Sequence, residues 1–142
     1  MTYASLDMLK TRFGEQTLLQ LTDRADPPAG QIDADLVAQE LAKTDAVIDG
    51  YLAVKYRLPL ADVPPVVEDI ALSIAIYKLH VYAPDQKVKD DYDQALRSLR
   101  EIAAGTIKLP VAGIEPAPSG AEGVQYIDRC RPLSPESMTG FI

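Results

Sequence analysis

The sequence predicts an all-α fold, a small antiparallel helical bundle of three longer helices and two short N-terminal helices, followed by an extended C-terminal arm. Three observations predict it. Apolar residues recur at helical spacing through most of residues 34–104, and capping residues and glycines mark the expected helix ends. After about residue 109 that periodicity stops, and five prolines and four glycines follow. We therefore expect a helical domain over residues 1–109 and an arm over residues 110–142.

Two short helices are expected at the N-terminus. Ser5 is a good N-cap for "LDMLKTRF", in which Leu6, Leu9 and Phe13 share one face, and Gly14 ends this helix. "EQTLLQLT" forms the second, before a loop, "DRADPPAGQ", that two prolines and a glycine keep irregular.

The first longer helix begins after Asp33, which is a suitable N-cap. Its apolar positions recur at helical spacing, and several alanines raise its helix propensity. We expect it to end near Tyr56 or Arg57, since Pro59 cannot continue a helix.

The second longer helix should run from Pro65 to Tyr82. Proline suits a first helical turn, and the segment "VVEDIALSIAIYKLHVY" is apolar on nearly all sides. A helix of this kind belongs at the centre of a bundle. Its polar positions, Asp69, Ser73 and His80, lie near one face.

The third longer helix, residues 86–104, is the most clearly amphipathic. An apolar stripe from Val88 to Ala103 is opposed by charged residues, and Gly105 follows as a C-terminal stop in the left-handed conformation.

Composition excludes several classes of function. A net charge of −7 opposes binding to nucleic-acid phosphates, and the longest charge-free run in the apolar middle is too short to cross a membrane. The single Cys130 cannot form an internal disulfide. We therefore expect no specific nucleic-acid binding and no membrane segment.

The sequence shows no constellation of residues for catalysis, cofactor binding or metal binding, so we do not expect an enzyme. His80 lies too far along its helix from Glu68 or Asp69 for a hydrogen bond and reads better as a partly buried structural residue. The acidic residues of 23–35 match no calcium loop and read better as caps and solvated charges. The helical tyrosines lack a basic groove, which favours packing over base stacking.

Two segments are candidate protein interfaces. The stretch "YLAVKYRLPLADVPP" places tyrosines and cations where a helix must stop, and its prolines stiffen the turn. A capped helix connection explains this pattern equally well, whereas a contact between copies also explains a display of Tyr51, Lys55, Tyr56 and Arg57. The arm ends in "ESMTGFI", whose apolar residues could dock on its own bundle or on another protein: Met138, Phe141 and Ile142.

Several stretches together resemble a known family: "YASLDMLKTRFGEQTLLQLTDR", "DAVIDGYLAVKYRLPLADVPPVVEDIALSIAIYKLH", "YDQALRSLREIAAGTIKL" and the closing "ESMTGF". They are similar to the Mu-like phage and prophage head-tail connector proteins, over nearly all of residues 3–109. The resemblance implies a phage structural protein of the capsid neck, which completes the DNA-filled head and joins it to the tail. It implies a homo-oligomeric ring, twelve-fold by the family resemblance, with the portal protein and tail or neck proteins as partners.

The same resemblance implies a place in the virion neck, and in the cytoplasm of the bacterial host during assembly. DNA would pass through the ring, and a copy could be monomeric until it meets its docking surface. A non-viral helical module for protein binding or regulation, without catalysis, fits the composition as well and stays open as the alternative.

Overall fold

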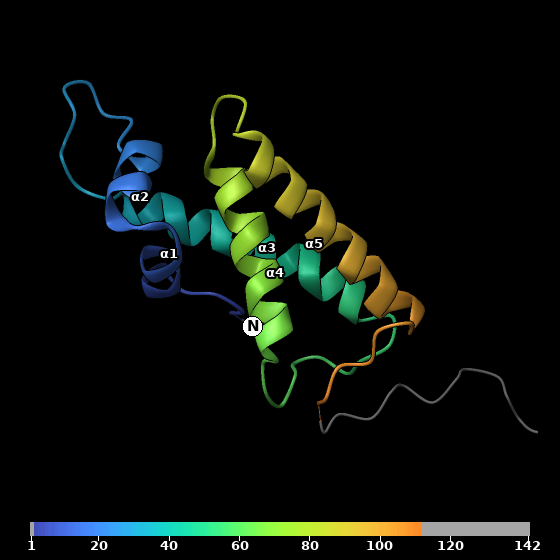
Figure 1. Ribbon diagram of the computed structural model, residues 1–142. Coiled ribbons are helices and arrows are strands. Elements are labelled where there is room, and N and C mark those ends of the chain that lie inside the picture. The colour runs from blue at the N-terminus through green and yellow to red at the C-terminus, as the bar shows by residue number, and fades with distance from the viewer. Residues whose placement is uncertain (1, 112–142) are drawn as a thin grey trace, which may run out of the picture.

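The computed structural model describes residues 2–111, and these form five helices and no strand (Figure 1). The all-α prediction is therefore confirmed. The helices are α1 (Leu6–Phe13), α2 (Glu15–Thr22), α3 (Ala34–Leu52), α4 (Pro65–Leu79) and α5 (Gln86–Ala104).

The predicted caps are present. The Ser5 hydroxyl accepts from the N–H of Met8 at 3.3 Å, and an Asp33 carboxylate oxygen accepts from the N–H of Leu36 at 3.0 Å. Each side chain thereby satisfies a donor that the first turn of a helix leaves free. Gly105 ends α5 with φ of 81°, the left-handed conformation that glycine adopts without a Cβ clash.

Helix α3 ends at Leu52, and the expected end near Tyr56 or Arg57 is wrong. The N–H groups of Lys55 and Tyr56 both donate to the Leu52 carbonyl, at 3.0 and 2.8 Å, so the chain tightens into a final turn instead of continuing. This turn carries the Tyr56 side chain into the core, where only 7% of it is exposed. Burial of the ring outweighs the helix propensity of the local sequence.

Helix α4 ends at Leu79, so the predicted end at Tyr82 is also wrong. Side chains form hydrogen bonds with the backbone carbonyls that would accept from N–H groups if the helix continued. Arg24 Nη2 donates to the Leu79 carbonyl at 3.1 Å, and His80 Nδ1 lies 2.8 Å from the carbonyl oxygen of Ile76. His80 is half-buried and extended at this end, as expected for a structural histidine.

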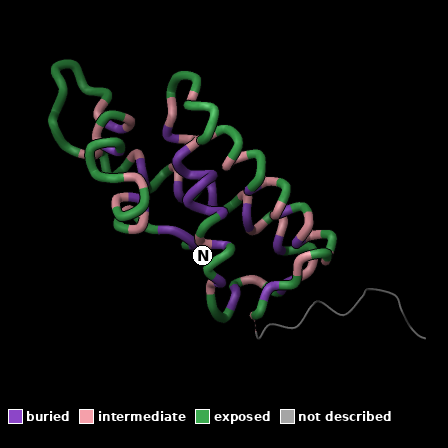
Figure 2. The backbone as a smooth tube through the Cα atoms, viewed as in Figure 1, coloured by how far each residue is buried: buried purple, intermediate pink, exposed green. Residues whose placement is uncertain are grey.

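Helix α4 lies at the centre of the bundle and contacts α1, α3 and α5 (Figures 1 and 2). It carries nine buried residues, more than any other helix of the described part, which confirms its predicted central place. α5 runs antiparallel beside it, and the rings of Tyr77 and Tyr92 stack between the two helices with centroids 4.0 Å apart. Apolar burial on this scale supplies the main driving force for folding.

Helices α1 and α2 cover a further side of the bundle (Figure 1). Leu9 and Leu18 are fully buried in the shared core, and Arg12 of α1 forms an ion pair with Asp69 of α4. Asp69, predicted to lie on a polar seam of its helix, is exposed at this contact, whereas Ser73 is buried and donates to the Asp69 carbonyl at 3.0 Å. None of the helices in residues 2–111 is both long and apolar enough to cross a membrane.

Candidate interaction surface

The corner, residues 51–65, joins α3 to α4 and contains four of the predicted interface residues. Tyr56 lies inside it, and the tyrosine hydroxyl accepts a hydrogen bond from the N–H of Leu109 at 3.0 Å. Leu109 is itself buried, and Ile107 and Val111 pack against the same core. The corner therefore holds the segment that follows α5, residues 105–111.

Lys55 also serves this internal contact. Its ammonium nitrogen lies 2.9 Å from the position that a Cβ on Gly105 would occupy. The cation is thus close to the C-terminal end of α5, where the helix dipole favours positive charge. The structure thus places the Lys55 ammonium at the end of α5.

The four predicted corner residues therefore have different environments. Arg57 is exposed, Tyr51 and Lys55 are half-buried, and Tyr56 is buried. The expectation that the corner displays two tyrosines and two cations is wrong for Tyr56, because its ring packs in the core as the packing interpretation of the tyrosines predicted. The three predicted arm residues lie outside the described residues: Met138, Phe141 and Ile142.

The boundary predicted between residues 109 and 110 falls within residues 105–111. Leu109 is buried, and Val111, which we had assigned to the arm, packs partly against the core.

A cluster that sequence reasoning missed ties the N-terminal segment to α3. Asp45 accepts from the N–H of Tyr3 at 3.1 Å, and the Tyr3 hydroxyl donates to Asp49. Burial raises the pKa of the Asp45 carboxyl, whereas the bond from Tyr3 lowers it. Burial and the neighbouring Asp49 raise the pKa of Tyr3. The two carboxylates lie one turn apart on α3, a spacing that was visible in the sequence, but their partner lies more than forty residues away.

The end of the bundle opposite to the corner consists of the loops of residues 23–30 and 80–85, and we call it the tip (Figure 1). Asp23 accepts from the N–H groups of Ala29 and Gly30 at 3.0 and 2.7 Å, and these two bonds lower its pKa. Arg24 joins the two loops through its bond to Leu79. The Asp23 carboxylate is therefore a loop cap, as the sequence favoured, and no group of three or more potential metal ligands occurs among residues 2–111.

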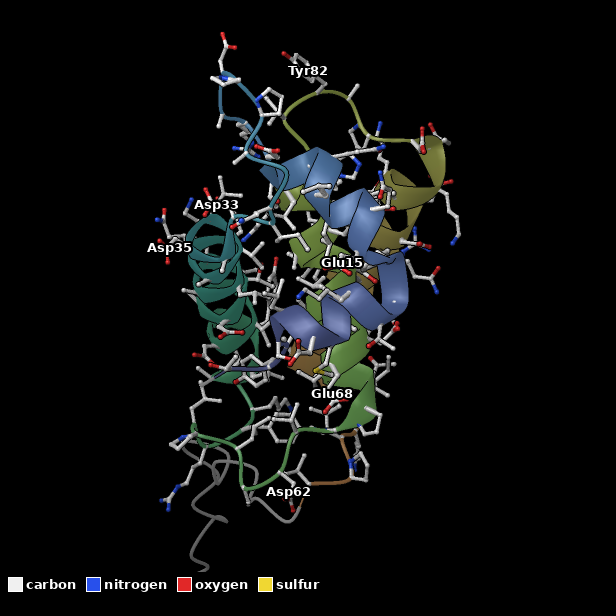
Figure 3. The ribbon with its side chains drawn as sticks, turned by 90° about the vertical axis from the view of Figure 1, so that its left-hand side faces the viewer. Glu15, Asp33, Asp35, Asp62, Glu68 and Tyr82 are labelled. Atoms are coloured by element: carbon white, nitrogen blue, oxygen red, sulfur yellow. The ribbon has the colours of Figure 1, made fainter. Side chains whose placement is uncertain are left out.

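A groove of about 450 Å³ lies beside the tip and is lined by the end of α2, including Leu21, and by residues of both loops, including Arg24 and His80. Val81 and Tyr82 also line it and are 59% and 87% exposed. Figure 3 shows Tyr82 projecting from this end of the molecule.

The base is the other end of the bundle, and it comprises residues 53–66 and 105–111. Val54 and Val66 are 62% and 47% exposed here, and Figure 3 shows Asp62 of the same end far from Tyr82. In residues 2–111 the large apolar side chains with high exposure are thus two at the tip and two at the base. Each end therefore offers exposed apolar side chains as candidates for a protein contact.

Fold and surface together define a small all-α protein whose two ends each present apolar side chains. The chain belongs to the family described as "Bacteriophage Mu, Gp36", whose model matches residues 3–127. The Mu-like phage family suggested by the sequence is thereby confirmed.

Two relatives give the extent of the similarity. Gene product J of Escherichia phage Mu is 28% identical over 142 residues, which is the full length of both chains. The Mu-like prophage FluMu protein gp36 of Haemophilus influenzae is 33% identical over 107 residues, 75% of this chain and 74% of the relative. The chain is therefore a phage-type protein, which disfavours the alternative of a non-viral module.

Proposed function

We propose that this protein is a structural component of the phage particle, a head-tail connector that forms a homo-oligomeric ring between portal and tail. Such a ring would complete the DNA-filled head and occupy the virion neck, after synthesis in the bacterial host cytoplasm. Its partners would be the portal protein and the tail or neck proteins. This role needs no catalysis and no cofactor.

The observation that carries the proposal is the pair of exposed apolar ends on a well-packed bundle of a phage protein family. The described helices pack around one apolar core, and four large apolar side chains at the two ends lie outside it. Contacts at both ends suit a protein that lies between neighbours in an assembly.

Two further features support the proposal. The hydrogen bond between Leu109 and Tyr56 fixes the base, and the bond from Arg24 to Leu79 fixes the tip. A surface that is already ordered loses less conformational entropy when it binds a partner. The net charge of −7 would let DNA pass through a ring without strong attachment to its wall.

The test uses phage heads assembled without this protein. Purified full-length protein is added to these heads, followed by tails, and the neck is imaged by electron cryomicroscopy. We expect a ring of density at the portal and recovery of complete particles. Heads that join tails equally well without the protein, or a neck without ring density after its addition, would refute the connector role.

A truncation of the C-terminal arm provides a second test. We expect a variant that lacks residues 136–142 to keep the melting temperature of the intact chain but to restore no head-tail joining. A truncated protein that restores full joining would remove the arm from the proposed contact.

A further inference from the structure

We propose that copies of this chain bind one another head to tail, with the tip of one copy seated on the base of the next. The contact would bring Val81 and Tyr82 of one copy against Val54 and Val66 of its neighbour. The inference rests on the proposed function, because it names the contact that would build the ring.

The first argument is the distribution of exposed apolar side chains. Tyr82 is 87% exposed, and Val81 beside it is 59% exposed, both in the loop between α4 and α5. Val54 follows the end of α3, and Val66 lies in the first turn of α4. Helix α4 separates the two pairs, and its 15 residues span roughly 22 Å at about 1.5 Å per residue. The two pairs therefore lie on separate surfaces of the described bundle.

The second argument is charge. Carboxylates outnumber cations at the tip, where Asp23, Asp26 and Asp85 accompany Arg24. Cations outnumber carboxylates at the base, which carries Lys55, Arg57, Lys108 and Asp62. Opposite charge on two apolar surfaces favours their association and opposes contact between two tips or two bases. The occupant of the tip is therefore a second copy presenting its base.

The third argument is closure. Tip and base are different surfaces, so a contact between them is heterologous, and every bound copy leaves one tip and one base unused. Association of this kind gives a ring where the rotation between neighbouring copies closes and an open filament where it does not. The proposed function selects the ring. A symmetric contact of tip with tip would stop at two copies and could not form a ring.

The bundle also presents these surfaces in fixed positions. Arg24 bonds to the carbonyls of Leu21 and Leu79 and so joins the two loops of the tip. The base is held by the bond from Leu109 to Tyr56. Each end is thus prepared for a neighbour before that neighbour arrives.

The test is disulfide cross-linking between full-length chains in which Cys130 is replaced by serine. One chain carries Tyr82→Cys and a second, distinguishable by an affinity tag, carries Val54→Cys. Mixed at millimolar concentration under mild oxidation, the two should form a mixed dimer several-fold more abundantly than either homodimer. A mixture of Lys87→Cys with Val54→Cys is the control, because the Lys87 side chain is also highly exposed but lies on α5, outside the tip.

Sedimentation equilibrium provides an independent measurement that does not need disulfide geometry. The average mass of the unmodified protein should rise with concentration, whereas Tyr82→Asp and Val54→Asp should each stay monomeric with an unchanged melting temperature. A protein that remains monomeric at millimolar concentration and gives no excess of mixed dimer would overturn the inference. So would a predominance of Tyr82→Cys homodimers.

Imaging of the same variants on phage heads separates this inference from the proposed function. Complete rings from both Tyr82→Asp and Val54→Asp would refute the head-to-tail contact and leave the connector role intact. Absence of a ring from the unmodified protein, combined with the expected cross-link, would refute the connector role and leave the contact intact.

Discussion

The hydroxyl of Tyr56 accepts a hydrogen bond from the backbone N–H of Leu109, at 3.0 Å, and so connects two segments that are 53 residues apart. Both residues are buried, at 7% exposure each. The bond therefore satisfies a donor that water cannot reach, and it holds residues 105–111 against the corner.

Removal of this acceptor should weaken the fold. In Tyr56→Phe the ring remains but the N–H of Leu109 loses its partner, and an unsatisfied buried donor costs about 1–3 kcal/mol. Urea denaturation should show a lower midpoint with a similar slope. Tyr82→Phe removes a hydroxyl from a side chain that is 87% exposed and should leave the midpoint unchanged. Equal midpoints for both variants would contradict the role of the bond.

Two glycines should respond oppositely to alanine. Gly105 has φ of 81° and lies under the Lys55 ammonium, so Gly105→Ala should cost about 1–2 kcal/mol, mainly through the left-handed backbone. Gly50 lies within α3 and an added Cβ would meet nothing within 4 Å. Gly50→Ala should therefore raise the free energy of unfolding by up to about 1 kcal/mol. Thermal melts of the two variants should shift in opposite directions, and a shared direction would contradict this account.

Charges in the core of α4 should prevent folding. Ile74 and Leu79 are fully buried, and an unpaired aspartate at either position costs several kcal/mol, comparable with the whole stability of a domain of about this size. Far-ultraviolet circular dichroism should show a large loss of helix in Ile74→Asp and Leu79→Asp. The control is Lys87→Asp, at a side chain that is 88% exposed. Native melting of either core variant would exclude the central place of α4.

The Asp45 carboxyl should give a pH-dependent contribution to stability. Burial raises its pKa above the ordinary value of 3.8, so the folded protein holds this proton more strongly than the unfolded chain does. This contribution to stability is fully present below pH 3.8, and it is lost as the pH rises through the pKa that Asp45 has in the folded protein. Asp45→Asn keeps an acceptor for Tyr3 without the charge, and the variant should gain stability relative to the unmodified protein as the pH rises to 7.

Denaturation at a series of pH values between 3 and 7 checks this expectation. Asp93→Asn, at an exposed position of α5, controls for the loss of one negative charge. A difference between Asp45→Asn and the unmodified protein that is constant across the series would refute the contribution of Asp45.

The excess of acidic over basic residues predicts a low affinity for DNA. Duplex binding depends on the displacement of counterions by clustered cations, and 21 acidic residues outnumber 14 basic ones in this chain. Fluorescence anisotropy with a labelled duplex should show no saturable binding at physiological salt. A tight interaction that weakens steeply with added salt would contradict the prediction.

The helices could be predicted because their determinants are local. Ser5, Asp33 and Gly105 mark helix ends by their own chemistry, and all three act as the sequence indicated. The ends of α3 and α4 could not be predicted in this way. They depend on the burial of Tyr56 and on the bond from Arg24 to Leu79, which join residues distant in sequence.

The same distinction applies to the candidate surface. The corner was recognised from its prolines, tyrosines and cations, but the sequence could not show that Tyr56 and Lys55 turn toward residues 105–111. Val81 and Tyr82 were assigned to a helix that ends before them, so their exposure was missed. An apolar residue identifies a surface only once the end of its helix is known.

The long-range ties also bear on synthesis of the chain by the ribosome. Tyr3 meets Asp45 and Asp49, and Tyr56 meets Leu109, at separations of 42, 46 and 53 residues. Contacts between such distant residues form late and slow the folding of a domain. The N-terminal helices must therefore wait for α3 and α4 to be translated, and a chain interrupted before Leu109 leaves the Tyr56 hydroxyl without its donor. Nascent chains of this protein would expose apolar surface until nearly all of the helical domain has emerged, which makes them clients for chaperones that bind such surface.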